Sequence, residues 1–231
     1  MTAANHIADN LARIRERIAA AIARRGPGPD VTLIGVSKRQ PIAAIEAAIE
    51  AGLRDFGENY AQELRDKVAA IGQDPPRWHF IGGLQRNKVK YAVGKALIHT
   101  VDRAELVDAI DARAARDGLT QEVLIEVNLG DEAQKAGIAA ADLPALLGRF
   151  AATPRVRCRG LMIIPPVGET EDARPYFARL RELRDRLAAT PRAGVALDHL
   201  SMGMSADFEA AIEEGATLVR VGTAIFGERP R

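Results

Sequence analysis

Short apolar runs alternate with longer amphipathic stretches along almost the whole chain, and this alternation limits the fold more than any other feature. The first run, VTLIGVSK at residues 31–38, is nearly continuous in apolar residues and rich in β-branched ones. A strand that is buried on both faces of a parallel sheet has this composition. Further strand-like runs begin near Asp55 and cover residues 78–81, 98–101, 122–128, 156–163, 199–201 and 218–221.

The stretches between most of these runs have the periodicity of helices. Before the first run, an apolar face ending near Gly26 consists of Ile7, Leu11, Ile14, Ile18 and Ile22. Further helices are predicted over residues 41–50, 60–70, 103–116, 140–151, 174–188 and 206–213. About eight strand–helix units predict a (β/α)8 barrel of the TIM type. We expect one domain, 1–231, with the N-terminal helix, 1–26, packed on the barrel.

A doubly wound open sheet would show the same alternation, so the number of units and the chain length decide for the barrel. A net charge of +1 gives no reason to expect a nucleic acid or an anionic membrane as partner. The single cysteine, Cys158, excludes an internal disulfide. No apolar run is long enough to span a bilayer, and the N-terminal segment is too polar for a signal peptide. We therefore expect a cytoplasmic protein.

Lys38 directly follows the first apolar run. In a barrel and in an open α/β sheet alike, ligand sites gather where strands end and the next loops begin. Partial desolvation at such a place lowers the pKa of a lysine and frees the neutral amine to form a Schiff base. The alternative is a lysine whose ammonium group simply extends to the rim.

Two further motifs follow strand-like runs. In FGENY (56–60), Asn59 precedes a helix, and an N-cap is its simplest interpretation. In WHFIGGLQRNK (78–88), a lone histidine within a strand, His79, is more simply a hydrogen-bonded core residue than a catalyst. The pair Gly82 and Gly83 allows a tight turn after it.

The last two strand-like runs both end in glycine and hydroxyl groups. Ser205 stands where an N-cap belongs, and the N-terminus of a helix suits a phosphate. Gly222 and Thr223 follow the next run and offer close backbone approach and a hydroxyl donor. Ordinary capping and turn chemistry would explain either segment alone. Their coincidence matches the phosphate site that barrels often have after the seventh and eighth strands.

Arg220 lies two residues before Gly222, and strand alternation directs both toward the barrel interior. A buried guanidinium needs a partner. One interpretation is a salt bridge to Glu122 or Glu126, and the other is a contact with the ring nitrogen of a ligand. A protonated arginine there would leave the ring nitrogen unprotonated and would weaken the ring as an electron sink.

Taken in order, these motifs make the chain similar to the pyridoxal phosphate homeostasis proteins, which are relatives of the N-terminal barrel of alanine racemase (fold type III). The matching motifs are VSK (36–38), FGENY (56–60) followed by Gln62 and Glu63, WHFIG (78–82), LQRNK (84–88), VN (127–128) with Lys135 and Gly137, GLM (160–162), LSMGMS (200–205) and RVGTAIFG (220–227). Gly83 departs from the pattern, because many members have a bulkier residue or proline there, and this puts the stiffness of the loop in doubt.

The resemblance implies a covalent aldimine between Lys38 and pyridoxal 5′-phosphate (PLP), with Arg220 facing the pyridine nitrogen. It also implies phosphate contacts from Ser205, Gly222 and Thr223, with Ser201 close by, and places Asn59 near the phenolic oxygen. We assign no catalytic and no metal-binding residue.

The resemblance further implies a carrier or regulator of free PLP. Racemases of this fold type use a second acid or base, usually a tyrosine on an added β-domain, and no such domain is predicted here. The three tyrosines, Tyr60, Tyr91 and Tyr176, all fall in stretches predicted to be helical. The alternatives are a PLP-dependent racemase or decarboxylase and, more remotely, a class I aldolase that uses Lys38. Other B6 vitamers and PLP-dependent apo-enzymes are candidate partners, and we expect a monomer.

Overall fold

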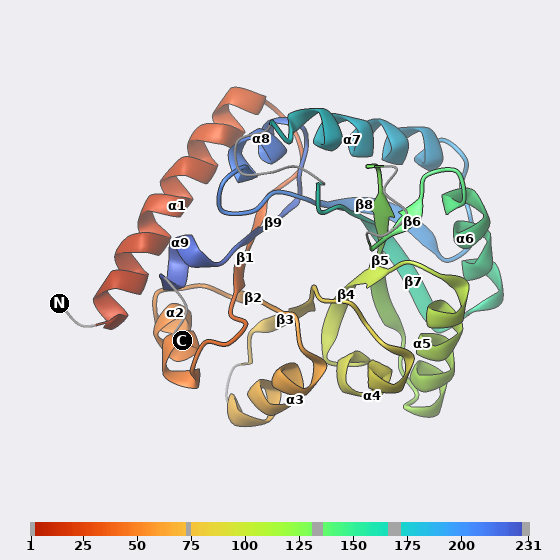
Figure 1. Cartoon of the computed structure of the whole chain (residues 1–231), viewed down its shortest axis with the longest axis horizontal. Coiled ribbons are helices and arrows are strands. Elements are labelled where there is room, and N and C mark those ends of the chain that lie inside the picture. The colour runs from red at the N-terminus through yellow and green to blue at the C-terminus, as the bar shows by residue number, and fades with distance from the viewer. Residues whose placement is uncertain (1–2, 73–74, 131–135, 166–171, 228–231) are drawn as a thin grey trace.

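The computed structural model describes residues 3–72, 75–130, 136–165 and 172–227. Its strands are β1 (Thr32–Val36), β2 (Asp55–Glu58), β3 (Arg77–Phe80), β4 (Ala96–Val101), β5 (Gln121–Asn128), β6 (Ile138–Ala139), β7 (Val156–Met162), β8 (Val195–Ser201) and β9 (Leu218–Val221). They lie in the order β4-β3-β2-β1-β9-β8-β7-β5-β6, and an additional β4–β5 pairing closes the ring. All of the pairings between named strands are parallel. With the two-residue β6 outside the ring, the predicted closed barrel is confirmed (Figure 1).

Helices surround the barrel on its outside (Figure 1). They are α1 (Ala3–Arg25), α2 (Ile42–Glu50), α3 (Ala61–Ala70), α4 (Val89–Ala92), α5 (Ala104–Arg116), α6 (Leu143–Arg149), α7 (Arg174–Ala188), α8 (Phe208–Glu213) and α9 (Thr223–Phe226). The sequence did not predict α4, α9 or β6. Elements of two to four residues are too short to show a helical or alternating period.

The apolar residues form two cores that the barrel wall separates. The larger core lies between strands and helices and includes Phe56, Phe80 and Phe177. The smaller one, inside the barrel, consists of Ile34, Leu124, Met162 and Leu218. Because side chains alternate along each strand, the remaining inward positions belong to other residues. Several of them are polar and buried, namely Asp55, His79, His99, Glu126, Ser201 and Arg220.

The first helix, α1, packs along α8, α2 and α9 on the outside of the barrel (Figure 1). The Asn10 side-chain amide donates a hydrogen bond of 2.8 Å to the carbonyl of Ile225. Arg17 forms an ion pair of 3.0 Å with Glu209 on α8. These contacts tie the first helix to the last two. No helix in the described ranges has both the length and the apolar character needed to cross a bilayer.

Candidate functional site

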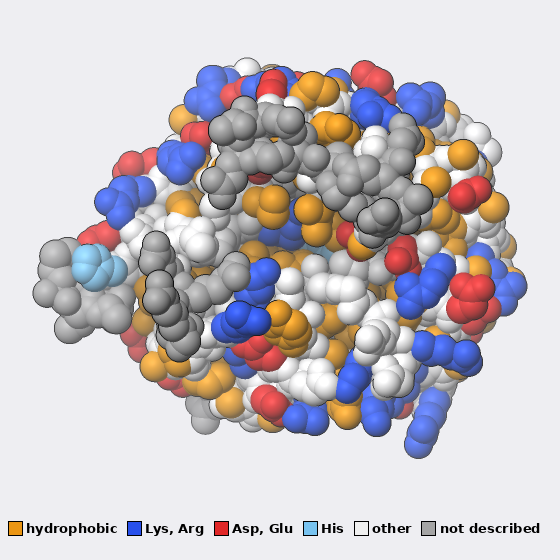
Figure 2. Space-filling view, in the orientation of Figure 1, with side chains coloured by type: hydrophobic (Ala, Val, Ile, Leu, Met, Phe, Trp, Pro, Cys, Tyr) orange, Lys and Arg blue, Asp and Glu red, His pale blue; other side chains and the backbone are white. Residues whose placement is uncertain are grey.

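A cavity of about 300 Å³ opens at the carboxyl ends of the strands. Six of the seven predicted site residues line it: Lys38, Asn59, Ser205, Arg220, Gly222 and Thr223. Apolar side chains complete the lining, namely Val36, Ile81, Ile164, Met204 and Ala206. Figure 2 shows hydrophobic and basic side chains around the hollow at the centre of this face. The seventh predicted residue, Ser201, is fully buried beneath the cavity rather than on its wall.

The backbone before Lys38 is anchored by a buried ion pair. Lys67 on α3 donates to the carbonyl oxygen of Ser37 at 2.7 Å and to Glu58 Oε1 at 2.7 Å. The Ser37 hydroxyl also donates to Glu58 Oε1, at 2.6 Å. The side chains of Lys67 and Glu58 are only 6% and 0% exposed, so this cluster lies in a low-dielectric interior. The residue that precedes Lys38 is therefore held through both its backbone and its side chain.

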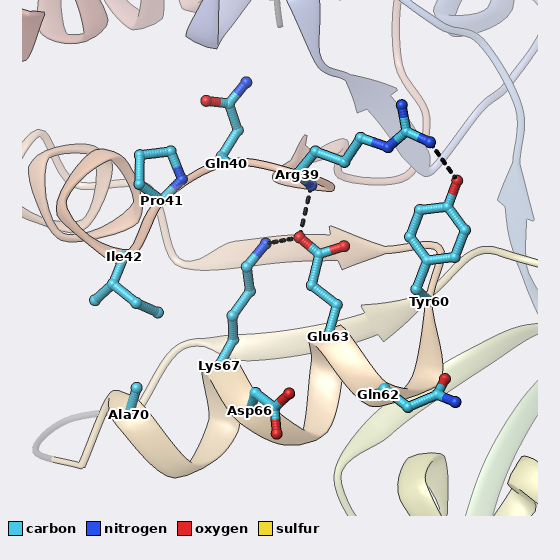
Figure 3. Close-up of a pocket in the computed structure, with 10 residues that line it drawn as sticks. All are labelled: Arg39, Gln40, Pro41, Ile42, Tyr60, Gln62, Glu63, Asp66, Lys67 and Ala70. Carbon is cyan, nitrogen blue, oxygen red and sulfur yellow. Dashed lines mark hydrogen bonds and ion pairs between the residues drawn. The ribbon is translucent and has the colours of Figure 1, made fainter. Parts of the chain in front are cut away.

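The backbone after Lys38 is anchored to the same helix. The N–H of Arg39 donates to Glu63 Oε1 at 2.6 Å, and Lys67 donates to the same oxygen at 2.7 Å. Arg39 has a left-handed φ of 61°, a conformation that costs a residue with a side chain free energy. Figure 3 shows the Glu63 carboxylate between Lys67 and the Arg39 backbone, with the Arg39 guanidinium turned toward Tyr60. This carboxylate holds the turn that presents Lys38.

The Glu58 carboxyl group, on which this anchor depends, is buried, and burial disfavours its charged form. Burial raises the pKa of Glu58, although hydrogen bonds from Lys67 and Ser37 oppose the rise. Its second oxygen, Oε2, is buried and has no hydrogen-bond partner among the described residues. A surface pocket of about 710 Å³ lies on the outer side of the cluster, lined by Glu63, Lys67 and neighbouring residues of α3 and the turn before α2 (Figure 3).

The predicted phosphate residues meet at one wall of the cavity. The N–H of Gly222 donates to the Ser205 hydroxyl at 3.3 Å. Thr223 begins α9, and the first N–H groups of a helix have no acceptor within the helix itself. A hydroxyl from each of two neighbouring loops and the start of a helix therefore converge here. Donors that converge in this way suit the oxygen atoms of an anion.

The predicted N-cap role of Ser205 is wrong. The N-cap of α8 is Asp207, whose carboxylate accepts a hydrogen bond of 2.6 Å from the N–H of Met204. Gly203 enters this turn with φ 90°, and a Cβ there would lie 2.6 Å from the Cβ of Ala211. The turn before the helix is thus longer than the sequence suggested. It leaves the Ser205 hydroxyl in the cavity wall instead of on the helix end.

Asn59 does not cap a helix either, since Tyr60 is the N-cap of α3. Its Oδ1 atom is buried, and no partner for it occurs in the described ranges. An unpartnered buried amide oxygen at a cavity wall is costly unless a ligand satisfies it. The backbone of Asn59 also explains Gly82, because a Cβ at position 82 would lie 2.1 Å from the Asn59 carbonyl oxygen.

Arg220 is 4% exposed and reaches the cavity from inside the barrel. Its Nη1 atom donates to Ser201 Oγ at 2.6 Å and its Nη2 atom to the carbonyl of Ile163 at 3.0 Å. The guanidinium carries further N–H donors that these two bonds do not use. Burial lowers the pKa of Arg220 to about 10, so the group stays protonated at neutral pH.

The salt bridge to Glu122 or Glu126, which was one of the two interpretations of Arg220, does not form in the described part of the chain. Glu122 binds Arg159 instead, at 2.5 Å, beside the hollow at the amino ends of the strands. Glu126 is buried inside the barrel and interacts with Arg220 only through space, which lowers its pKa slightly. Burial dominates and raises the pKa of Glu126 to about 7.

Sequence reasoning missed a buried polar row behind Arg220. The predicted assignment of His79 as a hydrogen-bonded core residue is confirmed, because it contacts Asp55 at 3.1 Å and His99 at 3.0 Å. His99 in turn contacts Ser201 Oγ at 2.9 Å. Strand alternation places all four side chains inside the barrel, and this is the signal by which the row could have been found.

Two remaining predictions concern residues outside this cavity. Lys135 lies outside the described residues, whereas its motif partner Gly137 lies within them. Tyr60 precedes α3 rather than lying in it, and its hydroxyl accepts a hydrogen bond of 3.4 Å from Arg39. Tyr91 and Tyr176 lie in α4 and α7 as predicted.

The cavity combines groups of complementary chemistry. One wall offers backbone N–H and hydroxyl donors, the floor a buried cation, and the strand end an amine. Such a set suits a small planar molecule that carries a phosphate and a carbonyl group.

Comparison with known proteins gives the family. Residues 5–230 match the family model of the alanine racemase N-terminal domain. The pyridoxal phosphate homeostasis protein of Aquifex aeolicus is 50% identical over 224 residues, which cover 96% of this chain and 97% of that protein. That of Escherichia coli K12 is 43% identical over 230 residues and 97% of each chain. The structure of PipY from Synechococcus elongatus with PLP bound has a TM-score of 0.83 and 39% identity, over 96% of this chain and 100% of that one. The chain therefore belongs to the pyridoxal phosphate homeostasis protein family, with the barrel of the alanine racemase N-terminal domain.

Proposed function

We propose that this protein binds PLP reversibly and takes part in PLP homeostasis by sequestering, buffering or delivering the cofactor. The observation that carries the proposal is the convergence of the Lys38 strand end, the buried Arg220 and the Ser205–Gly222–Thr223 wall on one cavity. PLP presents an aldehyde, a pyridine nitrogen and a phosphate, and each has a counterpart in that lining.

In the proposed complex the Lys38 amine attacks the aldehyde carbon, the new C=N bond forms an aldimine, and the aldehyde oxygen leaves as water. Thr223, Gly222 and Ser205 hold the phosphate at the start of α9. Arg220 faces the pyridine nitrogen with the N–H donors that Ser201 and Ile163 leave unused. Ser201 acts behind Arg220 rather than on the phosphate, because its hydroxyl is occupied by Arg220 and His99.

The buried oxygen of Asn59 supports the fit. Its side-chain amide lies in the cavity wall, where it meets the phenolic oxygen of the proposed ligand directly or, through its Oδ1 acceptor, a protonated imine nitrogen. A ligand that satisfies this amide removes the desolvation penalty that it carries in the free protein. The unpartnered oxygen is thus an observation made on the protein alone that favours a polar ligand at this wall.

The groups around the cavity favour a protein that carries PLP over an enzyme that uses PLP in catalysis. Arg220 stays protonated at neutral pH, so a ring nitrogen facing it accepts a hydrogen bond and takes up no proton. An unprotonated ring stabilises a carbanion poorly. Among the described residues that line the cavity there is no tyrosine to serve as a second acid or base. A PLP-dependent racemase remains the second candidate function because Lys38 supplies an amine at the end of a strand in this cavity.

The remaining partner predictions stay proposals. Other B6 vitamers that share the ring and phosphate fit the same lining but, without an aldehyde, form no bond with Lys38. PLP-dependent apo-enzymes are the proposed recipients of the cofactor. We also propose a monomeric, single-domain protein in the cytoplasm, where the buried Cys158 stays reduced.

The test is an absorbance spectrum of the protein mixed with PLP, followed by borohydride reduction and peptide mapping. The expected result is a yellow protein and one phosphopyridoxyl group on Lys38. Lys38→Ala removes the label, whereas Lys95→Ala, at an exposed lysine on the opposite end of the barrel, leaves it unchanged. A colourless protein whose Lys38 is unmodified overturns the proposal.

Two further measurements separate the alternatives. Exchange of the α-deuterium of an amino acid at a catalytic rate would favour the racemase or decarboxylase, and its absence in PLP-loaded protein would favour the carrier. Borohydride trapping of a keto substrate on Lys38 without any pyridoxal absorbance would instead favour an aldolase.

A further inference from the structure

A row of buried hydrogen bonds crosses the inside of the barrel behind the cavity. Arg220 Nη1 lies 2.6 Å from Ser201 Oγ, and Ser201 Oγ lies 2.9 Å from His99 Nδ1. His99 Nε2 lies 3.0 Å from His79 Nδ1, and His79 Nε2 lies 3.1 Å from Asp55 Oδ1. Each of the five residues is at most 5% exposed. We call this row the interior chain.

The interior chain joins the two ends of the barrel. Arg220 lines the cavity at the carboxyl ends of the strands. Asp55 and His79 line a separate hollow of about 520 Å³ at the amino ends. There Arg77 closes the chain with two hydrogen bonds to the Asp55 carboxylate, of 2.8 and 2.6 Å. One continuous set of side chains thus links the ligand cavity to the opposite mouth.

When both imidazole rings are neutral, the chemistry of the two end residues fixes the direction of every bond between them. Arginine only donates, so Ser201 Oγ accepts from Arg220. An ionised carboxylate only accepts, so the Nε2–H of His79 donates to Asp55. A neutral His79 then has an acceptor at Nδ1, which requires His99 to donate from Nε2. A neutral His99 accepts at Nδ1, and the Ser201 hydroxyl proton completes the chain.

The surroundings favour a neutral His99 and an ionised Asp55. Burial, with the charge of Arg220 adding to it, holds the pKa of His99 well below its usual range, so this ring is neutral. Burial acts to raise the pKa of Asp55, but hydrogen bonds from His79 and Arg77 outweigh it and lower the pKa, so this carboxyl is ionised. The bond lengths admit the same direction at every step.

We propose that the interior chain runs in one direction, from Arg220 to Asp55, and that His99, His79 and Asp55 are positioning residues that aim the Arg220 guanidinium at the ring nitrogen of the ligand. The Ser201 oxygen is a strong acceptor for Arg220 because its own proton is committed to His99. Turning the guanidinium would break the bond between Nη1 and the Ser201 oxygen, and would leave Nη1 without this acceptor in the interior. This role for Arg220 rests on the proposed function.

The direction itself is tested without ligand. Nitrogen-15 NMR of the imidazole rings in PLP-free protein is expected to show His79 and His99 as neutral tautomers with the proton on Nε2. Asp55→Ala removes the terminal acceptor, and we expect a mixture of tautomers on both rings. Asp198→Ala removes a carboxylate whose ion pair in the described ranges is with Arg159, and it is expected to leave both tautomers unchanged. A proton on His99 Nδ1 in the wild-type protein overturns the chain.

The positioning role is tested with PLP on the same variants. Loss of one directing contact to a charged group predicts a rise in the PLP dissociation constant of about three- to tenfold for Asp55→Ala, with a shifted absorbance maximum. Borohydride should still label Lys38, which shows that the site itself persists. Asp198→Ala is expected to bind as the wild type does.

The outcomes distinguish the two proposals. If wild-type protein binds no PLP, the proposed function fails, and with it the positioning role, whereas the tautomers still report the chain. If wild-type protein binds PLP and Asp55→Ala has mixed tautomers but wild-type affinity and absorbance, the positioning role alone is overturned. A poorly folded Asp55→Ala is replaced by His99→Gln, for which the same loss of affinity and shift in absorbance are expected.

Discussion

The two ends of the barrel treat their polar groups in opposite ways. At the amino ends of the strands, charges satisfy one another: Arg159 binds Glu122 at 2.5 Å and Asp198 at 2.9 Å. At the carboxyl ends, the amide oxygen of Asn59 is buried without a partner among the described residues, and Thr223 opens a helix whose first N–H groups have no internal acceptor. The charges of the amino end pair with one another, whereas the carboxyl end keeps hydrogen-bonding capacity that a ligand could use.

The volumes of the two cavities do not follow this difference in hydrogen-bonding capacity. The hollow at the amino ends, about 520 Å³, is larger than the cavity of about 300 Å³ at the carboxyl ends. A ligand gains affinity from donors and acceptors that are already desolvated and lack partners, and it gains little from groups that must first leave an ion pair. We therefore propose the smaller cavity, rather than the larger hollow, as the binding site.

The largest expected effect comes from the ion pairs. Lys67→Met leaves Glu58 buried without its cation and should lower the free energy of unfolding by about 3–5 kcal/mol. Arg77→Met breaks the matching pair at the other end, but its side chain is 72% exposed, so a loss of at most about 1 kcal/mol is expected. Urea unfolding of both variants measures the difference. Equal losses would show that the two ends do not differ in this respect.

The next effect depends on pH. The pKa of Glu126 is raised from about 4.5 to about 7 by burial, so the folded chain binds this proton more tightly than the unfolded chain. The free energy of unfolding should therefore fall on the order of 3 kcal/mol as pH rises from about 4.5 to about 7, and this group adds no further change above that. Glu126→Gln should remove this slope, and Glu122→Gln, at the exposed amino end of the same strand, should keep it. A wild-type slope in Glu126→Gln would contradict the assignment.

A smaller effect is expected in the loop that faces Asn59. Gly82→Ala places a Cβ 2.1 Å from a backbone oxygen and should cost about 1–3 kcal/mol together with much of the PLP affinity. Gly83→Ala meets nothing within 4 Å and should change stability by no more than about 0.5 kcal/mol. Thermal unfolding and PLP titration of this adjacent pair decide the matter. Comparable losses in both would mean that the loop is constrained by more than Asn59.

The smallest effect on stability is expected from a substitution at the amino ends of the strands. Asp198→Asn breaks an exposed ion pair, and about 0.5 kcal/mol or less should be lost, with PLP affinity unchanged. Repeating the urea unfolding at high salt should remove even this difference, because exposed pairs are screened. A loss above about 2 kcal/mol would show that the amino ends are less independent of the barrel than their exposure indicates.

The sequence predicted the barrel well because its evidence was distributed along the chain. Runs such as residues 31–38 are apolar enough to show a doubly buried strand on their own, and eight of them fix the architecture. Position after a strand was also enough to bring Lys38, Arg220 and Gly222 to one cavity. Information that depends on sequence order and alternation was therefore accessible.

The exact geometry of turns and the pairing of neighbouring strands could not be predicted from the sequence. Ser205 and Asn59 were interpreted as caps because each precedes a helix, whereas the real caps are Asp207 and Tyr60. A shift of one or two residues in a turn has little effect on local propensity and decides where a side chain points. The pairing of His79 with His99 likewise needs the register of β3 and β4, which no local pattern contains.

The pairing of β1 with β9 has a consequence for the order of events during synthesis. These strands align Thr32 with Leu218 and Gly35 with Val221, so the seam joins the beginning of the barrel to its end. Lys38 and Thr223 stand on opposite sides of this seam, and closing so long a loop carries the entropy cost that makes distant pairings slow. A nascent chain therefore has Lys38 long before it has a cavity. If the proposed ligand contacts both sides, its binding energy adds to the stability of this seam, and we expect the ligand to stabilise the closed barrel against unfolding.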